Sequence, residues 1–256
     1  LNLLIWIWAQ LVKVFTIVIK VEVMQMKKLS LVLTLVLVFS LTFVSQAAWI
    51  DGTYEGWSDA GPKSTQSAKV FIEDGKIVAV VLREFTDKHV EKDWSTYPWP
   101  QAGEAARTLG AQFVKNQAAE ADIVTGATHS SQGWIQAVER ALVRASDTKP
   151  DKKYFDGVFL GQSEVSSYGQ YYKVVWVTLK DDKIVDYTVQ RVLPDHTIQD
   201  PSAEVYGWPL ELARESYKEA AMKSEPGFVD VISGATGLTH QSNHAVRDAL
   251  DKARIK

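Results

Sequence analysis

A short phrase occurs twice in this chain and constrains its fold more than any other feature. Residues 122–128 read Asp-Ile-Val-Thr-Gly-Ala-Thr, and residues 230–236 read Asp-Val-Ile-Ser-Gly-Ala-Thr. In both copies the Asp lies six residues before the last Thr, and a hydroxyl residue, Gly and Ala lead into that Thr. Two such matches, each at the end of a longer duplicated unit, predict two equivalent sites.

The duplication extends over most of the chain. Asp51–Gly56 corresponds to Asp156–Gly161, and Tyr97–Pro100 corresponds to Tyr206–Pro209. The opening Asp lies 77 residues before the final Thr in the first copy and 80 in the second. A unit of this length is a domain and not a solenoid repeat.

We therefore expect two tandem copies of a small α+β domain, in which helices pack on a mostly antiparallel sheet. The copies are expected at residues 48–146 and 154–256, joined by a polar linker at 147–153. In the first copy, alternating apolar residues around Asp74-Gly75 predict a hairpin over 69–85. Apolar residues at helical spacing predict its helices. The second copy is expected to repeat this pattern. The predicted helices are 103–119 and 132–145 in the first copy, and 210–222 and 243–255 in the second.

The N-terminal segment has the pattern of a secretory signal peptide. Met26-Lys27-Lys28 is basic, an apolar run follows from Leu29 to Val44, and Ser45–Ala48 has the small residues of a cleavage site. We expect export, with cleavage after Ala47. The alternative is an uncleaved membrane anchor, because the run is only slightly shorter than the ~20 residues that span a bilayer.

Residues 1–25 have two interpretations. The segment is either an overlong start that precedes the true first residue at Met24 or Met26, or a first amphipathic or membrane-associated helix. We exclude it from the fold prediction.

The composition excludes several classes of protein. Cysteine is absent, which excludes disulfides, a lipid-modified Cys, Cys-ligated clusters and covalent c-type haem. Removing residues 1–47 takes away four of the 28 basic and one of the 31 acidic residues, leaving 24 against 30 and a net charge of −6. No basic stripe remains, so we expect no nucleic-acid partner.

The repeated phrase suits an anion. Its Gly and Ala leave the backbone open to close approach, and the predicted helix after it offers unpaired N–H groups and a favourable dipole. A phosphate is the anion that best suits this arrangement, and the hydroxyl oxygen of the last Thr could become the ester oxygen of that phosphate. The alternative is that both phrases are only helix caps, a common role for Asp, Ser and Thr.

Together these motifs resemble the FMN-binding domain family. The resemblance rests on Asp-x-x-Ser/Thr-Gly-Ala-Thr, preceded some 80 residues earlier by Asp-Gly-x-Tyr-x-Gly, and covers most of residues 49–256 as two copies. The family includes a component of the sodium-translocating NADH:quinone reductase and secreted bacterial proteins of extracellular electron transfer. In it, a flavin transferase uses FAD to attach FMN through its phosphate to the final Thr.

The resemblance implies two covalent FMN groups, on Thr128 and Thr236. Two departures concern the second copy. In the family one residue often separates the final Thr from a Thr-Ser or similar pair, and His129–Ser131 fits this pattern. In the second copy Gly237-Leu238 precedes Thr239, so the separation is one residue longer, and Phe159 replaces the Tyr of the opening motif. The remaining residues of the two recognition phrases are Asp122, Thr125, Gly126 and Ala127, and Asp230, Ser233, Gly234 and Ala235.

A flavin ring needs a flat apolar surface to bind against. Trp99 and Trp208, each two residues after a Tyr, recur before the first helix of each copy and are the predicted flavin contacts. The alternative is that they are core aromatics or lock a Pro-rich turn. We predict no metal site, because His240 and His244 have no evident third ligand.

The leading hypothesis is an exported flavoprotein that carries electrons between a membrane donor and an extracellular or periplasmic acceptor after maturation by a flavin transferase. No nucleophile–base set is evident, so we predict a carrier more than an enzyme, without catalytic residues. One alternative is a reductase with non-covalent FMN. Another is a duplicated extracellular binding module without a cofactor.

Overall fold

Three antiparallel strands and then two helices follow one another in each half of the chain. The computed structural model describes residues 49–199, 210–224, 226 and 228–255. We refer to residues 49–146 as the first half and to 154–255 as the second half. The predicted signal segment and Trp208 lie outside the described residues. Within those residues, no helix combines the length and the apolar character needed to cross a bilayer.

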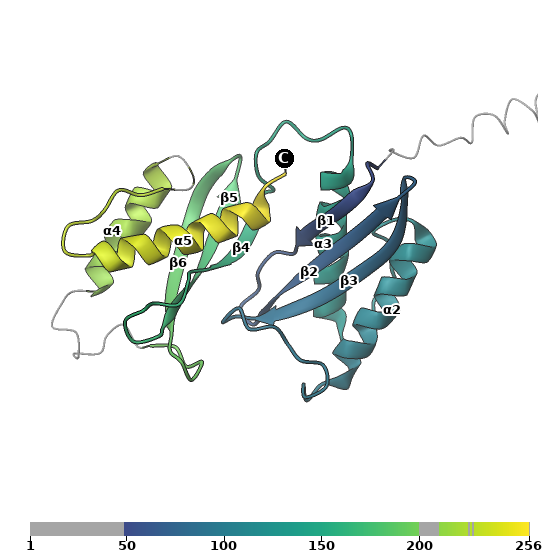
Figure 1. The fold of residues 1–256 in the computed structure, drawn as a ribbon, viewed down its shortest axis with the longest axis horizontal. Helices are drawn as coiled ribbons and strands as arrows, with labels where there is room; N and C mark the ends of the chain where they lie inside the picture. Colours follow the sequence, from purple (N-terminus) through teal and green to yellow (C-terminus); the bar gives the residue numbers. More distant parts are fainter. Residues whose placement is uncertain (1–48, 200–209, 225, 227, 256) are drawn as a thin grey trace, which may run out of the picture. The chain divides into compact units, whose positions relative to one another are not determined.

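The first half contains β1 (Gly52–Trp57), β2 (Ser64–Glu73) and β3 (Lys76–Thr86), followed by α2 (Pro100–Asn116) and α3 (Thr128–Ala145). The second half contains β4 (Gly157–Gln162), β5 (Tyr172–Lys180) and β6 (Lys183–Val192), followed by α4 (Leu210–Lys223) and α5 (Thr236–Ala253). Both sheets are antiparallel, with orders β1-β2-β3 and β4-β5-β6. The described residues therefore confirm an α+β fold of two three-stranded sheets and four helices (Figure 1).

Each sheet buries its apolar side chains against two helices. Helix α3 packs on β1 and β2 and α2 on β3, while α5 packs on β4 and β5 and α4 on β6 (Figure 1). Trp134 and Phe113 are fully buried in the first half, as are Phe159 and Tyr217 in the second. This burial of apolar surface is the main favourable contribution to folding.

The Asp at the start of each half closes a hairpin turn. The Asp51 carboxylate accepts the Gly75 N–H at 2.9 Å, and the Asp156 carboxylate accepts the Asp181 N–H at 3.0 Å. Both acceptors stand one residue before the first strand and both donors lie in the turn between the next two strands. This turn role accounts for both Asp residues.

The helix boundaries differ from the prediction at the N-terminal ends. Helix α2 begins at Pro100, three residues earlier than expected, which is possible because a Pro in the first turn loses no helical hydrogen bond. Helices α3 and α5 begin four and seven residues earlier than expected, at Thr128 and Thr236. The apolar periodicity that sets a helix prediction starts only after the polar first turn, so it does not reveal these turns.

Residues Ala47–Lys256 belong to a single unit of the fold, and its halves contact each other through buried polar groups. Arg140 of α3 donates to the Trp57 carbonyl oxygen at 2.7 Å, to the Asp59 carboxylate at 2.7 Å and to the Asp156 carbonyl oxygen at 2.9 Å. Its guanidinium also lies 4.7 Å from the centre of the Phe159 ring. One cation therefore joins the end of β1 and the loop that follows it to the start of the second half.

A second contact centres on His89. Its Nδ1 lies 2.7 Å from Gln162 Oε1, and its Nε2 lies 2.6 Å from the Lys252 ammonium nitrogen. This network suits neutral His89, with Nδ1 donating to Gln162 and Nε2 accepting from Lys252. Lys252 also pairs with Asp248 at 2.7 Å. Burial lowers the pKa of His89 to about 4, and the neighbouring Lys252 acts in the same direction.

The His89 network predicts acid sensitivity. An unfolded His has a pKa of about 6.5, so between pH 6.5 and 4 the unfolded chain binds a proton that folded His89 does not. The free energy of unfolding should therefore fall as the pH drops through this window, by at most about 1.4 kcal/mol per pH unit. Thermal melts at pH 7, 6 and 5 should show a smaller loss for His89→Asn than for wild type.

The exposed His196 provides the matched control, because it shares the positive φ of His89 and Asn tolerates that conformation. His196→Asn should keep the wild-type acid sensitivity. If His89→Asn also kept it in full, the assignment of the effect to His89 would be wrong.

Candidate functional site

The residues that precede α3 and α5 form the same tight turn. In each phrase the Ala N–H donates to the carbonyl oxygen three residues earlier, at 3.0 Å in the first half and 2.9 Å in the second. Gly126 and Gly234, at the third position of these turns, have φ of +84° and +78°. This is a type II turn, which favours Gly at that position. The backbone conformation therefore explains the Gly of both phrases.

A side-chain hydroxyl three residues after the last Thr of each phrase forms two hydrogen bonds to the turn. Ser131 Oγ donates to the Ala127 carbonyl oxygen at 2.9 Å and accepts the Val124 N–H at 3.3 Å. Thr239 Oγ1 makes the two equivalent bonds at 3.1 and 3.3 Å. The expectation that the second copy is one residue longer here is therefore wrong. Aligning the copies without a gap would have identified Ser131 and Thr239 as equivalents.

Both predicted acceptors stand at the first residue of a helix. Thr128 opens α3 and Thr236 opens α5, and both residues are exposed. Within the described chain, neither of these helices has a side chain that caps its N-terminus. Their first N–H groups and positive dipole ends are thus available to an anion beside an exposed hydroxyl.

The other phrase residues surround this point in different ways. Ala127 and Ala235 are only 6% and 8% exposed, so these alanines pack into the core and do not merely leave the backbone bare. Thr125 and Ser233 are exposed at the second position of each turn. Asp122 and Asp230 are exposed at the start of the phrases, and the Asp122 N–H donates to Gln112 Oε1 at 2.7 Å.

Trp99 lies against the first turn. Its indole N–H donates to the Gly126 carbonyl oxygen at 2.8 Å, while the residue keeps 54% of its surface exposed. It immediately precedes α2, and this hydrogen bond joins it to a turn residue 27 positions later in the sequence. The structure thus places an exposed aromatic residue against the turn that precedes the predicted acceptor. Trp208 falls outside the described residues.

A cavity of about 700 Å³ lies beside the second turn. Helix α5 contributes Gly237, the residue after Thr236, together with His240 and Gln241. Its lining also includes Tyr171 and Arg191, whose guanidinium lies 4.0 Å from the centre of the Tyr171 ring. The sequence prediction missed this cavity, although the aromatic pair in Tyr168-Gly169-Gln170-Tyr171 offered a signal.

A buried ionisable side chain, that of Lys173 in β5, lies close to the start of α5. Lys173 is 2% exposed, and its ammonium donates to the Leu238 carbonyl oxygen at 2.9 Å. Burial, together with the nearby cations of Arg191 and Arg214, lowers the pKa of Lys173 to about 7. The prediction did not include Lys173 because a Lys in a strand ordinarily faces solvent.

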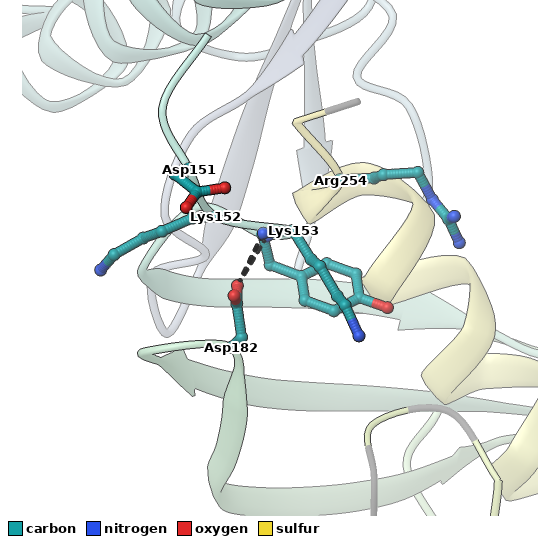
Figure 2. Close-up of a pocket in the computed structure, with 6 residues that line it drawn as sticks. Asp151, Lys152, Lys153, Asp182 and Arg254 are labelled. Carbon is teal, nitrogen blue, oxygen red and sulfur yellow. Dashed lines mark hydrogen bonds between the residues drawn. The ribbon is translucent and has the colours of Figure 1, made fainter.

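Another cavity, of about 280 Å³, lies at the predicted linker. The N–H groups of Lys153 and Tyr154 donate to Asp182 Oδ1 at 3.0 and 2.9 Å, and Arg254 also lines the cavity (Figure 2). Asp151 and Lys152 complete its wall. None of the predicted site residues lines it, so it is not a candidate for the repeated site.

The described residues contain no cluster of three or more His, Asp or Glu side chains that could hold a metal ion. His240 lines the cavity beside the second turn, and His244 Nδ1 lies 4.0 Å from the Glu164 carboxylate. Neither residue contributes to such a cluster.

Residues 61–143 match the family model of the FMN-binding domain. This segment contains the first phrase and Trp99. No curated protein matches the chain. A crystal structure of the CPE2226 protein from Clostridium perfringens is 24% identical, covers 38% of this chain and 88% of that chain, and has a TM-score of 0.33. That TM-score is too low to support an inference, whereas the family match supports FMN as a cofactor.

Proposed function

We propose that this chain, whose residues 61–143 match the FMN-binding domain, is an exported electron carrier with FMN joined by phosphoester bonds to Thr128 and Thr236. The observation that carries the proposal is the shared geometry of the two phrases. Each places an exposed Thr on the first residue of an uncapped helix, directly after a type II turn.

The chemistry of these residues fits the phosphate of FMN. The first N–H groups of α3 and α5 can donate to phosphate oxygens, and the helix dipole favours their charge. In the attachment reaction the Thr hydroxyl forms the new O–P bond with the FMN phosphate of FAD. The pyrophosphate bond breaks, AMP leaves, and the hydroxyl proton is released. A flavin transferase is the proposed catalyst, and the exposure of both Thr residues leaves them accessible to it.

We extend the assignment to the second half as a tandem copy. The second half repeats the strand order of the first. It also repeats the hydrogen bond from a hairpin turn to an Asp carboxylate and the hydrogen bonds from a side-chain hydroxyl to the turn of the phrase. The equivalence of Thr239 with Ser131 also addresses one of the two departures of the second copy, while Phe159 in place of the motif Tyr remains.

Bound FMN would supply the redox chemistry. On the protein side, Trp99 offers an exposed aromatic face at the first turn, and Tyr171 lines the cavity at the second. Because aromatic rings stack favourably in offset geometry, these residues are the proposed contacts of the flavin rings. Trp208 keeps the equivalent role as a prediction.

The N-terminal sequence supports export, with the mature chain on the extracellular or periplasmic side and the apolar segment as a candidate membrane anchor. The proposed partners are a membrane electron donor and an external acceptor. The polar contacts at both phrases fix the turns, and among these described contacts none joins a nucleophile to a base, which favours a carrier over an enzyme.

The decisive experiment is the intact mass of the full chain, produced with and without a coexpressed flavin transferase and denatured before analysis. We expect a transferase-dependent gain equal to two FMN groups less two waters. A yellow protein that loses its flavin on denaturation would instead indicate a non-covalent FMN reductase. A colourless protein of unchanged mass would indicate a binding module.

A further inference from the structure

The two sheets differ in charge at one pair of equivalent positions. Gln66 lies seven residues before the end of β2 and pairs across the sheet with Glu84 of β3. Lys173 lies seven residues before the end of β5 and pairs in the same register with Arg191 of β6. All four residues are buried.

Neighbouring charged residues increase this difference in charge between the two sheets. In the first half the Glu84 carboxylate is paired with the Lys92 ammonium at 2.6 Å. In the second half a further cation, Arg214 of α4, acts on both Lys173 and Arg191. A buried Lys directly opposite a buried Arg is unfavourable for a sheet, because like charges repel.

The cationic pair adjoins the helix start that carries Thr236. The Lys173 ammonium donates to the carbonyl oxygen of Leu238, two residues after Thr236, and lies 3.4 Å from Ser242 Oγ. Arg191 lines the 700 Å³ cavity together with Gly237, the residue after Thr236. In the first half the uncharged Gln66 lies at the equivalent position, against Gly133 of α3.

We infer that Lys173 and Arg191 raise the reduction potential of the flavin in the second half above that in the first. This inference rests on the proposed function. Reduction adds electrons, and the nearby Arg191 cation stabilises the added negative charge more strongly inside a protein than in water. Lys173, with a pKa of about 7, is partly charged and can take up a proton as negative charge develops beside it, which also favours the reduced flavin. Electrons would therefore pass from reduced FMN on Thr128 to oxidised FMN on Thr236. The first flavin would be oxidised and the second reduced.

The test uses two full-length proteins that each keep one flavin. Thr128→Ala retains the second flavin and Thr236→Ala retains the first. Redox titration followed by visible absorbance should give the more positive midpoint potential for Thr128→Ala. In that background Lys173→Gln, which introduces the residue found at position 66, and Arg191→Gln should each shift the midpoint to more negative values.

Arg247→Gln is the matched control, because Arg247 lies on α5 but is exposed; it should leave the midpoint unchanged. Circular dichroism and intact mass would establish that each variant is folded and carries flavin. Equal or reversed midpoints in the two single-flavin proteins would overturn the inference while leaving the proposed function intact. An unchanged midpoint in both Gln variants would also overturn it. A wild-type chain without flavin would overturn the proposed function itself.

Discussion

Replacing Thr128 with alanine is expected to remove one of two covalently bound FMN groups and so to halve the flavin content per chain. The hydroxyl oxygen of Thr128 is the only atom of that side chain that can form the phosphoester, and alanine keeps the helix start intact. Thr236→Ala should have the same effect, and the double variant should carry none. Absorbance of denatured protein, divided by protein concentration, measures the content directly.

Two controls separate attachment from folding. Thr128→Ser retains a hydroxyl at the same position and should keep more flavin than Thr128→Ala. Thr53→Ala removes an exposed hydroxyl from β1 and should keep both flavins. Unchanged flavin content in Thr128→Ala and Thr236→Ala would show that neither residue is an acceptor.

The sequence is sufficient to locate the candidate site because its key features are local. Gly126 and Gly234 are required by a turn of four residues, and the Thr that follows each turn begins a helix. The recurrence of Trp99 before the first helix marks it as a candidate, but the hydrogen bond that joins it to Gly126 depends on tertiary structure.

The sequence pattern carries less information about the sheets. It predicts β2 and β3 as a hairpin, but not the pairing of β1 with β2, because that pairing joins residues up to 20 positions apart, such as Gly52 and Ile72. It also misses the buried Glu84, Lys173 and Arg191. Their burial depends on helices that come later in the chain, so no local pattern distinguishes them from residues on a solvent-facing edge.

The last Gly of the Asp-Gly-x-x-x-Gly segment has a tertiary role that its sequence context does not reveal. A Cβ on Gly56 would overlap the Ala137 carbonyl oxygen of α3 and would lie 2.6 Å from the Ala141 nitrogen. A Cβ on Gly161 would overlap the Ala245 carbonyl oxygen of α5 and would lie 2.7 Å from the Ala249 nitrogen. In both halves a strand thus closely approaches the backbone of the helix that begins at the proposed acceptor Thr.

Gly56→Ala and Gly161→Ala are therefore expected to be strongly destabilising, since the obstructing atoms belong to helix backbone and cannot rotate away. Overpacking costs about 1–3 kcal/mol even where side chains can adjust, so we expect about 3 kcal/mol or more, a fall in Tm of about 6–12 °C for a chain of this size. Gly237→Ala, whose Cβ would meet nothing within 4 Å, should leave Tm unchanged or raise it. Calorimetry compares the three, and wild-type Tm in Gly56→Ala would disprove the close approach of α3 to β1.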